Sequence, residues 1–352
     1  MRKEFFALFF AFTLLCVILQ SCEDDAAINK ILGVGANAPV FISYKAVSGA
    51  EVEFQFSVPV KVLEAYVDEA VRFEPFPEDE YALIVTLKFA GDHSGGMSIT
   101  ADLLVEDADG NSLNLLVPFK TRNNRLPALK LNEVRFDYGK NSNGIYTLEF
   151  IELRAEADGN LGAMRLFVAS TSMDEPVYEF PQAEVKAGDY IVLHMRTKEG
   201  DTAKDELGDK LDLSSAKASK DDDVSDTARD LWVGGNEKTL HKADVIYLVD
   251  QDDKIIDALV VADSSDAWAK NKTLAKAAEL LAKQGAWFSK DGKPVKSPGY
   301  TDSVVNDKTT ATRTLCRDET ATDSNTLSDW YICDTSKATP GEKNSDKRYQ
   351  GK

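Results

Sequence analysis

The side chains that could carry chemistry in this sequence are few, and the cysteines stand out among them. The chain has four cysteines and three histidines. Cys16 and Cys22 lie at the end of an apolar run near the N-terminus, whereas Cys316 and Cys333 lie near the C-terminus. A thiol can be acylated, oxidised to a disulfide or bound to a metal ion, and the compartment of the protein decides among these fates.

The N-terminal segment has the pattern of a secretory leader. Arg2 and Lys3 precede an apolar run of roughly fifteen residues, fewer than the ~20 that a membrane-spanning helix needs. The run ends in LQSC (residues 19–22), which resembles the lipobox of bacterial lipoproteins, with Gln20 as a loose match. The resemblance implies cleavage of residues 1–21 and lipidation of Cys22 in the outer membrane of a bacterial cell envelope. An ordinary signal peptide with an extra cysteine is the alternative.

Three acids follow the predicted lipidation site. Glu23, Asp24 and Asp25 resemble the surface-export signal of some bacteria with two membranes, and the alternative is a solvated tether. Residues 22–39 are small and weakly patterned, so we expect them to form that tether. Acyl chains at Cys22 would contribute about 0.8 kcal/mol for each CH₂ buried in lipid, and the membrane is thus the first expected partner.

The two distal cysteines form one pair once Cys16 and Cys22 are set aside. In an oxidising compartment such a pair favours a disulfide, so we expect a bridge between Cys316 and Cys333. It would close a loop of about 17 residues and contribute roughly 3 kcal/mol in the chain-entropy model. The alternative is two buried thiols. The pair alone cannot form a structural zinc site, because that site needs four ligands.

Calcium is a candidate ligand at one acidic turn. Asp107, Asp109 and Asn111 offer oxygen ligands at alternating positions, as calcium prefers. A complete EF-hand loop that starts at Asp107 would place a glutamate at residue 118, where the chain has Pro118. The plainer interpretation is a hairpin turn built on Asp-Gly. No other cofactor is expected.

Motifs of known enzymes are absent from the sequence. It contains no HExxH, P-loop, GxSxG or GxGxxG pattern. His93 lies in a predicted glycine-rich turn, His194 lies within a predicted strand, and His241 starts one. A Ser-His-Asp triad assembled from distant segments stays open. The sequence therefore predicts a protein that is not an enzyme.

The net charge of the chain limits the classes of partner that it is expected to bind. The formal net charge is −18. A surface this acidic disfavours nucleic-acid phosphates and anionic lipid head groups, and no nucleic-acid partner is expected. Acidic surfaces stay soluble and repel one another, which suits an exported protein.

Period-two alternation predicts that strands dominate the fold. In the first half, apolar residues alternate with polar ones in four segments, and a turn at residues 107–111 separates the last two. The expected inward-facing residues are Val52, Phe54, Phe56, Val58; Tyr81, Leu83, Val85, Leu87, Phe89; Met97, Ile99, Ala101, Leu103, Val105; and Leu113, Leu115, Val117, Phe119. Residues 40–125 are therefore predicted to form an Ig-like antiparallel β-sandwich. Residues 121–127 are polar, end in Pro127, and predict a linker.

A second set of strands follows the linker, with two interruptions. The expected strands are residues 129–136, 145–154, 163–169, 189–195, 243–249 and 254–261. Residues 198–230 are rich in Asp, Lys and Ser and predict a mobile acidic loop. Residues 265–284 predict one helix, capped by Ser264 or Ser265 and ended by Gly285. Trp268 and Trp287 flank it, and packing is favoured over a carbohydrate platform.

Several short motifs in this second half occur in a characteristic order. They are LKLNEV (129–134), EFIEL (149–153), AGDYIV (187–192), RTLCR (313–317), DSN (323–325), DW (329–330) and ATPGEKN (338–344). Together they resemble the lamin tail domain, an Ig-like sandwich. The resemblance implies a fold for residues 126–345, with residues 346–352 as a tail, and it transfers no catalytic residue. Glu149 and Glu152 interrupt an apolar strand and must be solvated or paired.

Three functions from different classes remain open after these observations. The leading prediction is an all-β, lipid-anchored and non-enzymatic envelope protein that presents its lamin-tail-like domain to a protein or glycan partner. The second is an accessory module of an exported hydrolase or nuclease system, since lamin tail domains accompany such enzymes. The third is a hydrolase whose site lies in the acidic loop. Binding predicts an exposed aromatic or acidic patch, whereas catalysis predicts a pocket with a perturbed acid or histidine.

Overall fold

The computed structural model of the chain divides into two compact units. Unit 1 ends at Thr121 and unit 2 starts at Arg122, with residues 94–97 assigned to unit 2. The structure describes residues 38–351 except 69–70, 78–79, 92, 94, 141–145, 198–202 and 212–223. The predicted leader, Cys22 and all but the last two residues of the tether lie outside this range. No helix in the described part is long and apolar enough to cross a membrane.

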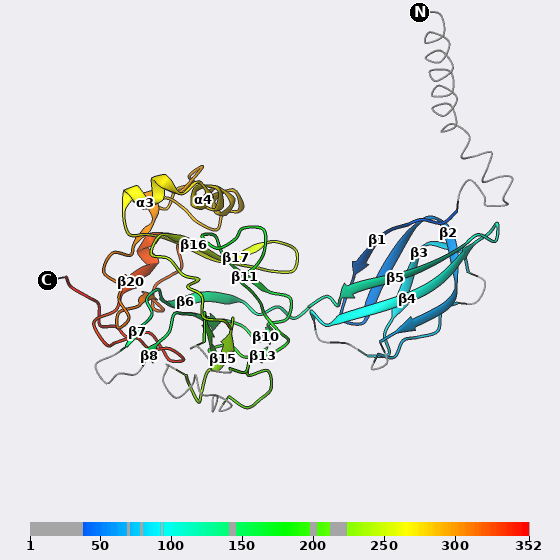
Figure 1. Ribbon diagram of the computed structural model, residues 1–352, viewed down its shortest axis with the longest axis horizontal. Coiled ribbons are helices and arrows are strands. Elements are labelled where there is room, and N and C mark those ends of the chain that lie inside the picture. Colours follow the sequence, from blue (N-terminus) through cyan, green and yellow to red (C-terminus); the bar gives the residue numbers. More distant parts are fainter. Residues whose placement is uncertain are drawn as a thin grey trace, which may run out of the picture. The chain divides into compact units, whose positions relative to one another are not determined.

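Unit 1 is a single sheet built around one long strand (Figure 1). Its strands are β1 (Phe41–Ala46), β2 (Glu51–Val67), β3 (Ala82–Lys88), β4 (Ser98–Asp107) and β5 (Ser112–Lys120). The first half of β2 pairs with β1 and β3, and its second half pairs with β4, which in turn pairs with β5. All these pairings are antiparallel.

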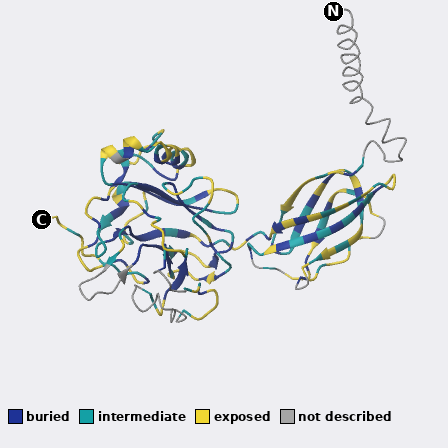
Figure 2. Ribbon diagram, in the orientation of Figure 1, coloured by how far each residue is buried: buried dark blue, intermediate teal, exposed yellow. Residues whose placement is uncertain are grey.

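Alternation along these strands produces the core of unit 1. Figure 2 shows buried and exposed stretches side by side along them. Phe54 and Phe119 meet edge to face with ring centroids 6.0 Å apart, and Phe89 stacks on Phe119. Val52, Leu87, Ile99, Leu103 and Val105 are also buried. Such aromatic contacts add about 0.5–1.5 kcal/mol each beyond the area that they bury.

The core differs from the prediction at several positions. Tyr81 and Leu83 were expected inside but are exposed, because the pairing of β2 with β3 shifts between Gln55 and Val60 and the inward alternation of β3 begins only at Val85. Four other residues expected inside are half-buried, namely Val58, Met97, Leu113 and Leu115, and Val60 is buried in place of Val58. Irregular pairing of this kind changes which face a residue occupies.

The predicted linker is packed rather than free. Thr121 and Asn123 are buried. The amide nitrogen of Asn123 donates to the carbonyls of Asn160 and Gly162 at 2.7 Å, and Gln251 exchanges two hydrogen bonds with the Asn123 backbone. Residues 122–125 therefore belong to unit 2, four residues earlier than predicted.

Unit 2 consists of two main sheets over one core (Figure 1). The six-stranded sheet has the order β15-β14-β9-β6-β19-β20 and the five-stranded sheet the order β12-β11-β16-β17-β18. Their strands are β6 (Leu129–Arg135), β9 (Phe150–Ala155), β11 (Arg165–Val168), β12 (Tyr178–Glu179), β14 (Tyr190–His194), β15 (Arg229–Trp232), β16 (Asp244–Val249), β17 (Ile255–Ala262), β18 (Val304–Val305), β19 (Leu315–Arg317) and β20 (Trp330–Ile332). Short pairs add β7 (Gly139–Lys140) with β8 (Tyr146–Thr147), and β10 (Gly159–Asn160) with β13 (Glu184–Val185).

The predominance of strands confirms the predicted all-β fold. The prediction that all strands of unit 2 pair antiparallel is wrong. The strand β15 runs parallel to β14, and β18 runs parallel to β17. Both parallel pairs involve strands whose connection contains a long loop or helices, as parallel pairing requires. Apolar residues of both sheets and of the helical segment form one core cluster.

The predicted helix is interrupted. The structure has α3 (Ser265–Lys270) and α4 (Lys272–Gln284), separated by Asn271. The Asn271 side chain accepts from the backbone of Thr273 and Leu274, so it caps α4. Gly285 ends α4 with φ of 70°, as predicted. Trp268 and Trp287 are buried in the core of unit 2, which confirms packing and leaves no aromatic platform there.

Both borders of the predicted acidic loop contribute to unit 2. Tyr178 and the backbone of Trp232 donate to Asp205, and Arg229 donates to the carbonyls of Glu206 and Gly208. The strand β15 begins inside the predicted loop. Asp221, Asp222 and Asp223 lie outside the described residues.

The C-terminal tail predicted for residues 346–352 continues the fold. The backbone of Asp334 donates to Lys347, and that of Tyr349 donates to Ile332. Arg348 donates to Asp318 at 2.5 Å. The domain therefore continues beyond residue 345, where its end was predicted.

Candidate functional site

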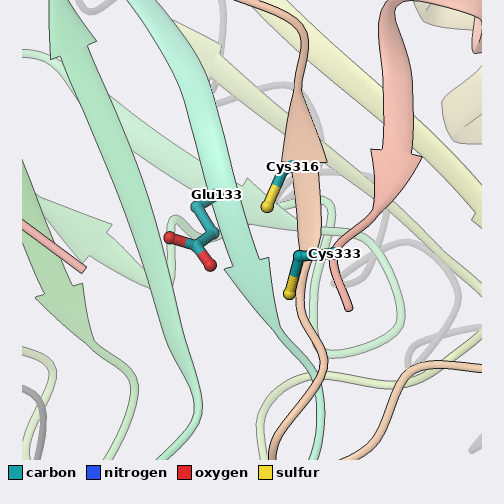
Figure 3. Close-up of side chains that lie close together, drawn as sticks. All are labelled: Glu133, Cys316 and Cys333. Atoms are coloured by element: carbon teal, nitrogen blue, oxygen red, sulfur yellow. The ribbon is translucent and has the colours of Figure 1, made fainter. Parts of the chain in front are cut away.

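Three ligand-type side chains meet in the interior of unit 2. Glu133 on β6, Cys316 on β19 and Cys333 just after β20 are fully buried, and their oxygen and sulfur atoms all lie within 4.8 Å of one another (Figure 3). We call them the acid–thiol cluster. The hydroxyl of Thr314 donates to Glu133 and lies 3.0 Å from the sulfur of Cys333 and 3.5 Å from that of Cys316.

A bulge in β6 aims Glu133 into this cluster. Leu131 pairs with Leu153 and Glu133 pairs with Glu152, so Asn132 is an extra residue on β6. A β-bulge of this kind reorients the side chains that follow it. Leu131 and Val134 therefore join the apolar core, while Glu133 lies on the other face, directly opposite Cys316 of β19.

The bulge also places two glutamates opposite each other. Glu133 and Glu152 are both fully buried, an arrangement that is destabilising when both are charged. Glu152 accepts from the amides of Asn132 at 2.7 Å and from the backbone of Gly341 at 2.5 Å. Glu133 accepts from the backbone nitrogen of Thr339 at 3.1 Å. The two acids therefore bind the C-terminal segment to the outside of the six-stranded sheet.

Gly341 is the residue that permits this close approach. Its φ is +81°, and a Cβ atom built on it would lie 2.5 Å from the Cβ of Ser225. A larger residue is excluded both by conformation and by space. Its backbone N–H donates to the carboxylate of Glu152.

Burial and mutual hydrogen bonds perturb the acid–base properties of the cluster. Burial raises the pKa of Glu133 to about 7, against the opposing effects of the Thr314 hydroxyl and the Arg135 guanidinium. Burial, and then the charge of Glu133, raises the pKa of Glu152 well above its usual value. A hydrogen bond from Cys316 lowers the pKa of Cys333 to about 6, and burial raises the pKa of the Cys316 thiol.

The structure contains two free thiols in place of the predicted disulfide. Cys316 pairs with Tyr331 across the β19–β20 ladder, and the backbone of Cys333 donates to Thr314. The two cysteines are thus diagonal neighbours in an antiparallel pair. Their sulfur atoms lie within 4.8 Å of each other, and no bond joins them in the structure.

A buried arginine joins the two sheets beside this cluster. Arg317 donates to the carboxylate of Asp257 on β17 and to Asp323, at 2.7 and 2.9 Å. Its guanidinium also lies over the ring of Trp330, 4.7 Å from the centroid. Burial raises the pKa of Asp257, and Arg317 opposes that effect. The link is therefore a buried ion pair that is also held by hydrogen bonds.

The predicted calcium turn is a hydrogen-bonded hairpin in the structure. The Asp107 carboxylate accepts from the backbone of Asp109 and Asn111 and from the Asn111 side chain, each at 2.9 Å. Burial tends to raise the pKa of Asp107, but the hydrogen bonds from Asn111 outweigh it and the pKa is lowered. Asp109 is exposed. The three residues come together, yet the carboxylate of Asp107 already stabilises the turn.

Other polar residues that the sequence could not place are paired. Glu149 accepts from Arg196, and Glu152 is bound as described, so both are paired rather than solvated. His194 and Asp230 form a buried pair at 2.7 Å, and the His194 ring stacks on Trp232. Among the described residues, no serine or cysteine side chain bonds the His194 ring, so no triad is assembled there.

Two surface cavities of unit 2 are lined by polar and charged residues. One of about 560 Å³ is lined by His241, Ser170 and Lys242, and burial lowers the pKa of His241. Ser170 donates to the buried Asp244 rather than to that histidine. A polar cavity of about 280 Å³ is lined by Arg154, Arg317 and Glu319, and neither Glu133 nor Glu152 lines it.

An exposed patch lies on unit 1 instead. Tyr66 of β2, Asp102 of β4 and Leu116 of β5 are directly opposite one another in neighbouring strands and share the outer face. Tyr66 and Leu116 are 63% and 68% exposed. The adjacent row on that face contains Glu64, Leu104 and Asn114. We call these six residues the outer-face patch. The sequence alternation predicted the strands but did not single out this surface.

Comparisons with known proteins place residues 127–332 under a family model named TP_1001_2nd and described as "protein second domain". A curated relative, an uncharacterized protein of Treponema pallidum (strain Nichols), is 27% identical over 194 residues, which cover 52% of this chain and 46% of the relative. The chain therefore matches less than half the length of that relative. A solved structure, the N-terminal part of the bacterial S-layer protein SbsC, aligns at 13% identity and a TM-score of 0.23 over 43% of this chain and 39% of that one.

Proposed function

The chain belongs, through residues 127–332, to the TP_1001_2nd family. We propose that this family member is a lipid-anchored, non-enzymatic protein of the bacterial cell envelope and that it binds a protein partner. Unit 2 acts as a closed structural module, and the outer-face patch of unit 1 is the binding surface. The attachment is a lipid on Cys22. No nucleic acid takes part, given the acidic charge of the chain.

The outer-face patch is the observation that carries this proposal. An exposed tyrosine and an exposed leucine flank Asp102 on a regular sheet surface, and Glu64 lies in the next row. Protein interfaces typically have aromatic and apolar residues at the centre and a polar rim. Small-molecule and glycan sites are usually concave, and the patch is a sheet face. A protein partner with a complementary basic rim fits this surface.

The packing of unit 2 supports its proposed role as a structural module. Its sheets share one core, and its buried acids bind the chain's own backbone. We also propose that unit 2 is lamin-tail-like and that unit 1 is related to Ig-like modules, although its five strands pair in one sheet. Four of the motifs contribute residues to the network around the acid–thiol cluster: LKLNEV, EFIEL, RTLCR and ATPGEKN. Their shared structural role supports the proposal that their order is inherited from a lamin tail domain. The parallel pairs β14–β15 and β17–β18 are additions to a simple antiparallel sandwich.

Two experiments test the proposal. Cells that express the full chain are fed an alkyne-labelled fatty acid, and the label is expected on the wild type and absent from Cys22→Ser. Capture from envelope extract then compares the wild type with Tyr66→Ser/Leu116→Ser and with Val305→Ser, an exposed apolar control in unit 2. A defined protein that is lost only with the unit 1 variant supports the proposal. Capture of a glycan, or equal capture by all three proteins, contradicts it.

A further inference from the structure

We propose that Glu133, Cys316 and Cys333 bind one divalent metal ion of the zinc class, which links β6 to β19 and to the residue after β20. This site is separate from the outer-face patch and does not rest on the proposed binding function. Three ligand atoms from three chain segments already lie within 4.8 Å of one another in a fully buried position. Their convergence requires the Asn132 bulge and the β19–β20 turn together.

The donor set selects the kind of metal. Two sulfur atoms and one carboxylate favour borderline or soft ions such as Zn²⁺, because thiolates bind these ions strongly. Hard ions such as Ca²⁺ and Mg²⁺ prefer oxygen ligands alone. The cluster therefore differs in chemistry from the calcium turn that the sequence suggested around Asp107.

Neighbouring groups suit a bound cation in number and charge. Zinc at a structural site takes four ligands, and the Thr314 oxygen is the polar atom placed among the other three. Two thiolates and a carboxylate exceed the charge of a divalent ion by one. Arg135 supplies a balancing cation, because its charge acts on both Glu133 and Cys333.

The position explains what the ion would do for the fold. Cys333 itself forms a β-bridge with Arg348, and Glu133 accepts a hydrogen bond from the backbone of Thr339. A metal at this point would fix the C-terminal segment onto the six-stranded sheet. Metal binding of this kind stabilises the folded state, because the unfolded chain has no preformed site.

The test uses cobalt as a spectroscopic substitute for zinc. The full chain, purified with a non-thiol reductant, is titrated with Co²⁺ and followed by thiolate-to-cobalt charge-transfer absorption. We expect saturation at one equivalent, bleaching by added Zn²⁺, and a band that disappears in Cys316→Ser and Cys333→Ser. Glu133→Gln is expected to weaken binding at least tenfold. Asp244→Asn removes an equally buried acid on β16 of the other sheet, and it is the matched control that retains the band.

Cys16 and Cys22 remain in every variant, so any absorption they contribute persists in the double variant of Cys316 and Cys333 and is subtracted. Tryptophan fluorescence shows whether each variant is folded. If a variant fails to fold, X-ray absorption of the zinc-loaded wild type decides, with sulfur ligands expected at about 2.3 Å. A wild type without the charge-transfer band, or zinc with a shell of only oxygen and nitrogen, overturns the proposal.

Discussion

The two units of this chain differ in where their buried acidic residues lie. In unit 1 apolar residues alternate into the core, and the buried acid Asp107 lies in a turn where backbone N–H groups bind it. In unit 2 the acids Glu133, Glu152 and Asp257 lie within the sheets themselves. The difference teaches that alternation is sufficient to build a sheet, whereas buried acids determine which distant segments close over it.

The chain offers a way to observe the two units separately. All four tryptophans, Trp232, Trp268, Trp287 and Trp330, belong to unit 2. Tryptophan fluorescence therefore follows the unfolding of unit 2 alone. Hydrogen exchange of the amides in β2 and β4 follows unit 1.

The largest effect is expected where a buried ion pair joins the sheets of unit 2. Arg317→Met leaves the Asp257 carboxylate buried without its cation, which costs about 3–5 kcal/mol. Urea unfolding followed by tryptophan fluorescence measures this loss. Arg125→Met is the control, because the Arg125–Glu184 pair is exposed and is worth less than about 1 kcal/mol. Equal losses in the two variants would contradict the role assigned to the buried pair.

A comparable effect in unit 1 should come from an apolar residue. Leu103 is fully buried in β4, so Leu103→Ala is expected to destabilise unit 1 by about 2–5 kcal/mol. Faster hydrogen exchange in β2 and β4, with an unchanged urea midpoint by tryptophan fluorescence, is the expected result. A matching shift in the fluorescence midpoint would show that the two units unfold together.

The stabilities of the two units are expected to change with pH in opposite directions. Burial raises the pKa of Asp244 in unit 2 from 3.8 to about 7, against hydrogen bonds from Ser170 and Val245. Between these values the folded state holds a proton that the unfolded state has released, so the stability of unit 2 falls as pH rises from 4 to 7. The slope is of order 1 kcal/mol per pH unit for each such group. Asp107 has a lowered pKa, so its contribution to unit 1 is lost only as pH falls below 3.8.

Asp244→Asn removes one of these titrating groups and is expected to flatten the pH dependence of unit 2. Urea midpoints measured by fluorescence from pH 4 to 7 provide the test. An Asp244→Asn curve as steep as that of the wild type would exclude Asp244 as a contributor.

The smallest effect is expected at the turn of unit 1. Asp107→Ala removes an acceptor for the backbone of Asp109 and Asn111 and should destabilise unit 1 by about 1 kcal/mol. Asp107→Asn keeps one acceptor oxygen and should lose less. Hydrogen exchange at the ends of β4 and β5 measures the change, in the presence and absence of Ca²⁺. A calcium-dependent protection in the wild type would restore the metal interpretation of this turn.

The sequence predicted the strands well because their signal is local. Val52, Phe54 and Phe56 alternate with polar residues, and the structure buries all three. Irregular pairing has no such signal, which is why Tyr81 and Leu83 were placed on the wrong face. Asn271 looked like a helix residue, but its side chain caps α4 and divides the helix.

The candidate site was harder to predict, because it depends on contacts between distant segments. Glu133 comes from a strand nearly two hundred residues before Thr314, with which it shares a hydrogen bond. The one signal available was that Glu149 and Glu152 interrupt an apolar strand, whereas Glu133 lies among Lys130, Asn132 and Arg135 and gives no such signal. The spacing of Cys316 and Cys333 could not show that both lie beside Glu133, and the thiols that the sequence predicted to form a disulfide are free in the structure.

The outer-face patch is tested most directly by crosslinking in living cells. A photoreactive amino acid replaces Leu116 in unit 1 or, in a separate strain, Leu207 in unit 2, both of which are exposed. After illumination, position 116 is expected to give a protein adduct of discrete mass, and position 207 none. An adduct from position 207 alone, or from neither position, would contradict the assignment of the binding surface to unit 1.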